Sequence, residues 1–242
     1  MTTLYQFPIS HYCAKARWAL EYKGIDYRIT NLIPGPHIST LRKIAPGTIV
    51  PLLIDGDDTI QGSDAIITYL DKKQAHPALT PTTTADASMA HEWERYADTN
   101  VGVPLRLFFY FHVLQDRKLA IALLTEDGPW WAGTLYQFIF PIVRKRMRAV
   151  MRIDADNAKA TEAKLGVAFD SIEQRLEKHN FLAGPLFSRA DLSVSALLAP
   201  TWLMTAPLPE PLNAFIATHR DRPLFEWARR IYDDYRNIEK QA

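Results

Sequence analysis

All the strand-like segments of this 242-residue chain lie within its first 61 residues. β-Prone runs occur at 4–7, 25–32, 49–54 and 59–61, and helical patterns separate them. From residue 85 onward the apolar residues recur only with helical periodicity. This division predicts an α+β chain with a small mixed domain first and an all-α domain behind it.

The first part follows a definite order of elements. Strand 4–7 leads into a helix over 11–23, with Ser10 placed as its N-cap and Gly24 at its end, and strand 25–32 completes a βαβ unit. A short helix at 38–44, a hairpin of 49–54 with 59–61, and a helix over 65–72 capped by Ser63 then follow. The order βαβ-α-ββ-α therefore predicts one domain over 1–74.

The second part reads as a helical bundle after a linker. Residues 75–84 are rich in threonine and proline without periodicity, which is typical of a linker. The domain over 85–242 contains no convincing strand, and a kink is expected near Gly102 and Pro104 in its first helix. The predicted helices span 85–115, 131–152, 156–179, 189–203, 210–219 and 223–240.

Charge and cysteine content narrow the possible partners. Twenty-eight Lys and Arg against 27 Asp and Glu leave almost no net charge, so no nucleic-acid or membrane partner is expected. The sequence has no membrane-length apolar run and no signal-peptide pattern, which favours a cytoplasmic protein. The single cysteine, Cys13, excludes an internal disulfide framework, and no metal site is expected from the histidine spacing.

Three segments carry a family resemblance. The run SHYCAKARWAL at 10–20, the run PGTIVPLL at 46–53 followed by GSDAIITYL at 62–70, and FLAGPLFSRADL at 181–192 occur in the order and spacing of one family. Together they resemble the glutathione transferase superfamily, in its serine-type bacterial or zeta-like branch. The resemblance implies a thioredoxin-like N-terminal domain that binds glutathione, a helical-bundle C-terminal domain, a homodimer and a role in detoxification.

Ser10 is the candidate catalytic residue. A helix N-terminus favours an anion, and the resemblance implies that the Ser10 hydroxyl holds the glutathione thiolate there. The alternative is that Ser10 only caps the helix. Cys13, three residues later, is the alternative catalytic residue, although its position favours a small buried side chain.

The rest of the glutathione site is expected on two segments. The resemblance implies a cis bond before Pro51, which lets the Val50 backbone pair with the peptide, and a Ser63 that binds the γ-glutamyl carboxylate at a helix N-terminus. A strand-ending proline and an ordinary N-cap are the simpler alternatives. The full set of predicted glutathione-binding residues is Ser10, Ile49, Val50, Pro51, Gly62, Ser63 and Asp64.

The chain departs from the family pattern at two of these positions. Ile49 stands where many relatives have lysine, and Gly62 where many have an acidic residue or glutamine. Side chains that can replace the missing polar contacts are Gln61, Asp64, His37 and Lys43.

The electrophile pocket is expected near the start of the first helix. Its candidate residues are Pro8, His11, Tyr12 and Tyr110. Nine aromatic residues form either this pocket, the helix core or a dimer contact, namely Phe108, Phe109, Tyr110, Phe111, Trp130, Trp131, Tyr136, Phe138 and Phe140. The basic run Arg144, Lys145, Arg146, Arg148 and Arg152 is typical of a solvated helix face. Ser188 and Asp191 have the spacing of a structural capping box.

The sequence therefore favours a glutathione transferase that conjugates glutathione, as co-substrate, to a small hydrophobic electrophile. Two alternatives remain open. One is a glutathione-dependent thiol reductase or reductive dehalogenase that uses Cys13. The other is a non-catalytic binding or scaffold protein of the same fold.

Overall fold

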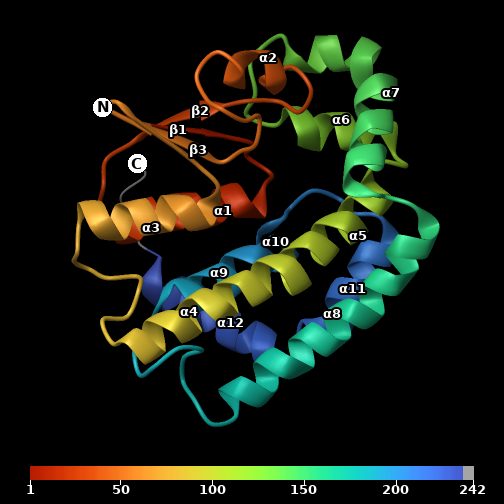
Figure 1. The fold of residues 1–242 in the computed structure, drawn as a ribbon. Helices are drawn as coiled ribbons and strands as arrows, with labels where there is room; N and C mark the ends of the chain where they lie inside the picture. Colours follow the sequence, from red (N-terminus) through yellow and green to blue (C-terminus); the bar gives the residue numbers. More distant parts are fainter. Residues whose placement is uncertain (237–242) are drawn as a thin grey trace.

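A computed structural model describes residues 1–236 of the chain, and the predicted helical residues 237–240 lie outside the described part (Figure 1). The N-terminal part is a four-stranded sheet in the order β2-β1-β3-β4. β1 pairs with β2 in parallel and with β3 antiparallel, and β3 pairs antiparallel with β4. The strands are β1 Thr2–Gln6, β2 Arg28–Asn31, β3 Leu52–Asp55 and β4 Asp58–Gln61.

Three helices complete this part, and the predicted order βαβ-α-ββ-α is confirmed. They are α1 His11–Tyr22, α2 His37–Leu41 and α3 Ser63–Lys73. Leu4 of β1, Leu53 of β3 and Ile66 of α3 are fully buried, because the alternating strand residues and the apolar face of α3 meet in one core. Strand β2 is shorter than predicted and α2 ends three residues earlier, as expected for element boundaries read from periodicity.

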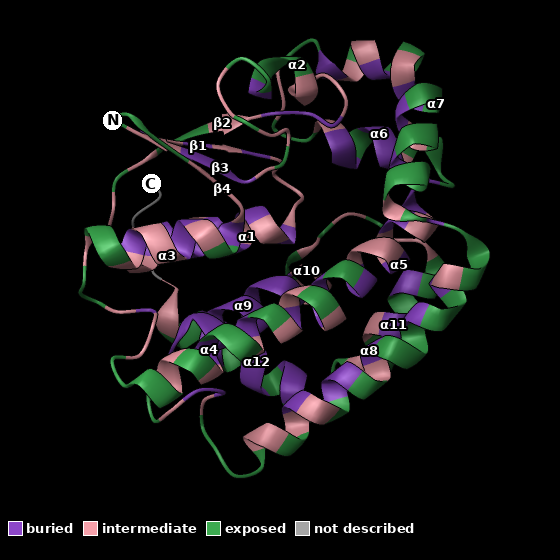
Figure 2. Cartoon of the chain, viewed as in Figure 1, coloured by how far each residue is buried: buried purple, intermediate pink, exposed green. Residues whose placement is uncertain are grey.

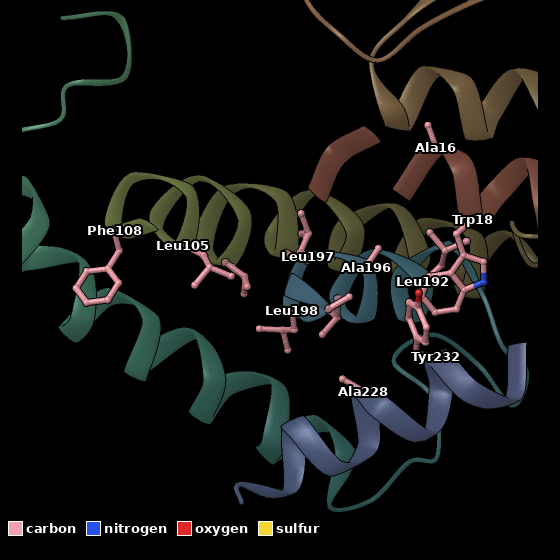
Figure 3. Close-up of a cluster of buried hydrophobic side chains, with 14 of the residues drawn as sticks. Ala16, Trp18, Leu105, Phe108, Leu192, Ala196, Leu197, Leu198, Ala228 and Tyr232 are labelled. Carbon is pink, nitrogen blue, oxygen red and sulfur yellow. The ribbon is translucent and has the colours of Figure 1, made fainter. Parts of the chain in front are cut away.

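The rest of the described chain is helical. α9 lies at its centre, with every residue buried, and packs against α1, α4 and α12 (Figure 2). In the close-up, Trp18 of α1 meets Tyr232 of α12 beside Leu192 of α9 (Figure 3). The helices are α4 Thr84–Ala97, the π-helix η1 Asp98–Gly102, α5 Val103–Val113, α6 Arg117–Thr125, α7 Ala132–Met151, α8 Ala155–Leu176, α9 Arg189–Leu198, α10 Pro200–Leu203, α11 Glu210–His219 and α12 Pro223–Tyr235.

The region predicted as one helix over 85–115 contains a π-helical turn. The expected irregularity near Gly102 is present, but it takes the form of η1 between α4 and α5. Two contacts from α1 hold this turn: the Tyr12 hydroxyl donates to the Asp98 carbonyl at 2.8 Å, and Lys15 Nζ lies 2.8 Å from Asp98 Oδ2. Because tertiary partners on another helix fix the turn, periodicity alone does not predict its form.

Helix α6 was not predicted. Its N-cap is Asp116, whose carboxylate accepts from the amides of Lys118 and Leu119 at 2.9 and 3.1 Å. Asp116 is a typical N-cap residue and is visible in the sequence. The helix is only 9 residues long, which is too short for an apolar periodicity to identify it.

Helices α6 and α7 lie beside α2 at one end of the molecule (Figure 1). The Tyr136 hydroxyl of α7 donates to the Pro34 carbonyl at 2.5 Å, and Asn31 Nδ2 of β2 donates to the Asp127 carbonyl at 3.0 Å. These contacts attach the α6–α7 pair to the N-terminal part. No helix within residues 1–236 has the length and apolar character needed to span a membrane.

Candidate functional site

Ser10 begins helix α1, as predicted. Its backbone is extended (φ −79°, ψ 120°), and its Oγ accepts from the Cys13 amide at 3.4 Å. A hydroxyl that accepts in this way still has its own proton to donate. Ser10 also lines the large cavity described below. The N-cap role and a contact to a ligand anion are therefore compatible.

Cys13 is fully buried in the first turn of α1. Burial raises the pKa of its thiol, and this outweighs the lowering by hydrogen bonds to the Ser10 side chain and the Phe7 backbone. The helix dipole therefore does not produce a reactive thiolate at this position. The small buried side chain that the sequence favoured is what the structure has.

Val50 presents free backbone groups in the loop just before β3. The predicted cis bond between Val50 and Pro51 is present. Among the described residues, neither the N–H nor the C=O of Val50 has a hydrogen-bond partner. Gln61 holds the preceding loop, since its side chain accepts from the Gly47 amide at 2.9 Å and donates to the Ile49 carbonyl at 3.0 Å. The Ile49 side chain is 60% exposed.

Ser63 is the first residue of α3, and the predicted N-cap role belongs instead to Gly62. Gly62 has φ +97°, a conformation that glycine adopts with little strain, and the N-cap therefore lies one residue earlier than expected. Within the described chain the amides of Ser63, Asp64 and Ala65 have no hydrogen-bond partner. Ser63 is buried and Asp64 is exposed. Gly62 donates to the Pro51 carbonyl at 3.0 Å, which ties this helix start to the Val50 loop.

A cavity of about 630 Å³ opens between the two parts of the molecule. Of the predicted pocket residues, His11, Tyr12 and Tyr110 line it and Pro8 does not, although its neighbours Phe7 and Ile9 do. Of the predicted glutathione residues, Ser10, Ile49 and Val50 line it. Pro51, Gly62, Ser63 and Asp64 do not contact the cavity.

The aromatic residues are divided among three environments. Phe108, Phe109 and Tyr110 of α5 line the cavity. Tyr136 and Phe140 of α7 are buried in the core, and Phe111 packs against it. Trp130, Trp131 and Phe138 are exposed.

His11 and Tyr12 form the cavity wall next to Ser10. His11 is buried, and its pKa is lowered to about 3 by burial and then by the charges of Arg106 and Lys15, so the imidazole is neutral at pH 7. Its Nε2 has no hydrogen-bond partner among the described residues. Burial also raises the pKa of Tyr12, and raises that of Tyr110 to about 12. The side chains of His11, Tyr12 and Tyr110 are therefore uncharged at pH 7 when a ligand contacts them.

The cavity also contains three arginines that the motifs did not single out as ligands. They are Arg42 after α2, Arg106 on α5 and Arg146 on α7. Arg146 belongs to the predicted basic run, most of which is solvated as expected. Arg106 had one sequence signal, since it is the only Lys or Arg in the apolar helix VPLRLFFYFHV. His37 also lines the cavity and its Nδ1 accepts from the Gly35 amide at 3.0 Å, whereas Lys43 does not reach the cavity.

Comparison with known proteins identifies the family. Residues 4–78 match the family described as glutathione S-transferase, N-terminal domain. A stringent starvation protein A homolog from Pasteurella multocida is 32% identical over 195 residues, covering 72% of this chain and 89% of that protein. Glutathione S-transferase Z1 from Arabidopsis thaliana is 43% identical over 81 residues, 32% of this chain. That match spans 37% of the Arabidopsis protein, and the match to glutathione S-transferase Z2 from the same plant also spans 37% of that relative.

Solved structures agree on the fold along nearly the whole chain. The β-etherase LigF from Sphingobium sp. strain SYK-6 has a TM-score of 0.64 at 18% identity, covering 95% of this chain and 98% of that one. A theta-class glutathione S-transferase from Xanthomonas axonopodis pv. citri, solved with glutathione bound, has a TM-score of 0.61 at 21% identity, covering 93% and 95%. The chain belongs to the glutathione S-transferase family.

Proposed function

We propose that this protein is a glutathione transferase that joins the glutathione thiolate to an apolar electrophile. The observation that carries the proposal is the position of Ser10, at the N-terminus of α1 and on the wall of the apolar cavity. A glutathione sulfur bound at this position would reach the Ser10 hydroxyl proton and the positive end of the α1 dipole. The cavity beside it has space for the second substrate.

The Val50 loop and the start of α3 supply the peptide contacts. The free N–H and C=O of Val50 pair with the cysteinyl backbone of glutathione, as an added strand would. The free amides of Ser63 and Asp64 take the γ-glutamyl carboxylate at the positive end of α3. Because Gly62 is tied to Pro51, the two contact sets have a fixed spacing.

Chemistry at the sulfur needs only a lowered thiol pKa and proximity. The glutathione thiol loses its proton to solvent, and the Ser10 hydroxyl donates a hydrogen bond to the resulting thiolate. The sulfur then forms a bond to the electrophilic carbon. With an aryl halide, the halide departs with the electron pair of the carbon–halogen bond; with an enone, the π electron pair moves toward the carbonyl and the resulting enolate takes a proton from solvent. Holding both reactants in one cavity supplies the rest of the rate enhancement.

The first experiment measures conjugation of glutathione to a panel of aryl halides and enones, with Ser10→Ala beside wild type. We expect kcat/KM to fall by about tenfold to a hundredfold in Ser10→Ala, since one hydrogen bond to a charged sulfur is lost. Ser10→Asp retains an N-cap acceptor, so it is expected to fold. It places a negative charge beside the sulfur, so its kcat/KM is expected to be no higher than that of Ser10→Ala. Ser88→Ala, on the exposed side of α4, is the matched control. Wild-type activity in Ser10→Asp would contradict the proposal.

The Cys13 reductase is disfavoured by one observation, the complete burial of a thiol whose pKa is raised. A non-catalytic binding protein is the second candidate function, and the unusual Ile49 and Gly62 favour it. Titration calorimetry separates the two remaining candidates: glutathione binding without turnover of any electrophile supports the binding protein, and binding with turnover supports the transferase.

A further inference from the structure

The cavity has a charge character that a purely apolar substrate does not need. None of its lining residues within the described chain is Asp or Glu, and three of them are the arginines Arg42, Arg106 and Arg146. Its two histidines do not add charge at pH 7, because burial lowers the pKa of both His11 and His37. The fixed charge that a ligand meets is therefore positive.

Arg106 is the least exposed of the three cavity arginines. It is half-buried on α5, and its guanidinium carbon lies 5.6 Å from the centre of the Tyr12 ring. No carboxylate or other hydrogen-bond acceptor binds it among residues 1–236. Its charge lowers the pKa of His11 and opposes the rise at Tyr12 and Tyr110, so the guanidinium stands close to all three.

The position of Arg106 relative to Ser10 decides which ligand group it meets. His11 and Tyr12 directly follow Ser10, whereas Arg106 enters from the C-terminal helices, on the wall that also includes Phe108 and Leu105. The groups proposed to hold glutathione, at Val50 and Ser63, belong to the N-terminal part. Arg106 therefore meets the group that a molecule bound against the helical wall places beside Tyr12.

We propose that the second substrate is an aromatic or aliphatic electrophile that carries an anionic group, a carboxylate or a sulfonate, and that Arg106 binds this group. The inference rests on the proposed transferase function. A planar guanidinium can donate two parallel hydrogen bonds to such a group, and partial burial strengthens them. The apolar remainder of the cavity takes the hydrocarbon body of the same molecule.

The test compares a chlorodinitrobenzoate with its uncharged methyl ester, which has the same reacting ring. Binding of each compound is measured by calorimetry, and kcat/KM with glutathione is measured alongside. We expect wild type to bind the acid more tightly than the ester, and Arg106→Gln to lose about tenfold to a hundredfold in affinity for the acid alone, as for loss of a hydrogen-bonded charge. Arg106→Lys retains the charge without the planar pair of donors, and is expected to fall between the two.

One control variant and three distinct outcomes complete the test. Arg117→Gln, on the exposed side of α6 and outside the cavity, should leave the ratio of acid to ester unchanged. Equal binding of acid and ester by wild type overturns the anionic substrate, while turnover of the ester leaves the transferase standing. Preferential binding of the acid without turnover of either compound supports Arg106 as the anion site and counts against the transferase. A raised thiol pKa of bound glutathione in Arg106→Gln, with the acid-to-ester ratio unchanged, would instead assign Arg106 to the thiolate.

Discussion

The molecule treats the cations of two regions in opposite ways: the buried cations of the first region are paired, and the half-buried arginine of the second is not. Between α1, α4 and α9, Lys15 Nζ lies 2.8 Å from both Glu94 Oε1 and Asp98 Oδ2, and Arg189 Nε pairs with the other oxygen of Glu94. In the cavity, by contrast, Arg106 has no carboxylate partner in the described chain. Both groups lie where the N-terminal part meets the helices, so the difference is in their role and not in their location.

The paired group holds the two parts together. Arg189 also donates to the Asp64 carbonyl at 2.9 Å and to the Thr68 hydroxyl at 3.0 Å, so one side chain of α9 fixes the first turns of α3. The amides of that turn are the ones proposed to bind the γ-glutamyl carboxylate. A buried charge with all its partners is typical of structure, whereas a cavity charge without one is typical of a site that awaits a ligand.

Removing Glu94 should give the largest effect on stability. Glu94→Ala leaves Arg189 without its carboxylate and Lys15 with Asp98 alone, so we expect the free energy of unfolding to fall by about 3 to 5 kcal/mol. Urea unfolding measures it, with the exposed neighbour Glu92→Ala as the matched control, expected to change stability by less than about 0.5 kcal/mol. Equal losses in the two variants would show that the paired group is not structural.

His11 gives an intermediate effect, which depends on pH. The unfolded imidazole has a pKa near 6.5 and the folded one about 3, so between these values the unfolded state binds more protons. Stability from this group is present above pH 6.5 and is lost as pH falls, by about 2 kcal/mol between pH 7 and pH 5. His11→Gln should remove that part of the pH dependence.

Unfolding curves at the two pH values check this, with His179→Gln, an exposed histidine, as the control. The charges of both Lys15 and Arg106 lower the pKa of His11. Loss of the slope of unfolding free energy against pH in His11→Gln alone would therefore sharpen the comparison between the two charged regions. An unchanged slope in that variant would mean that His11 is not buried between cations.

Cys13 should give the smallest effect. Because its thiol is fully buried and touches no reactant in the proposed mechanism, Cys13→Ala is expected to keep kcat/KM within about threefold of wild type. Mass spectrometry after treatment with oxidised glutathione should find Cys13 unmodified. A glutathione adduct on Cys13, together with loss of activity in Cys13→Ala, would restore the reductase alternative.

The sequence predicted features that short-range chemistry determines. The Ser188 and Asp191 capping box is present, and the Asp191 carboxylate accepts from the Ser188 amide at 2.9 Å, because both groups belong to one helix turn. The N-cap at Ser10 was predicted for the same reason. The domain boundaries at 74 and 85, the homodimer and the absence of a metal stay predictions.

Features that depend on distant residues were not predicted. The π-helical turn at Asp98 depends on Tyr12 and Lys15, which are more than 80 positions away in the chain. The placement of Arg106 in the cavity depends on how α5 packs against α1, and periodicity does not give that rotation. Only the presence of one cation in an otherwise apolar helix pointed to it.

The central claim is that the glutathione sulfur is bound as an anion by the Ser10 hydroxyl. Ultraviolet titration of the thiolate in the glutathione complex tests it most directly. A thiol pKa well below the free value of about 8.5 in wild type, rising by at least about one unit in Ser10→Ala, is the predicted result. The same pKa in both complexes would contradict the account, because the sulfur would then be bound without help from Ser10.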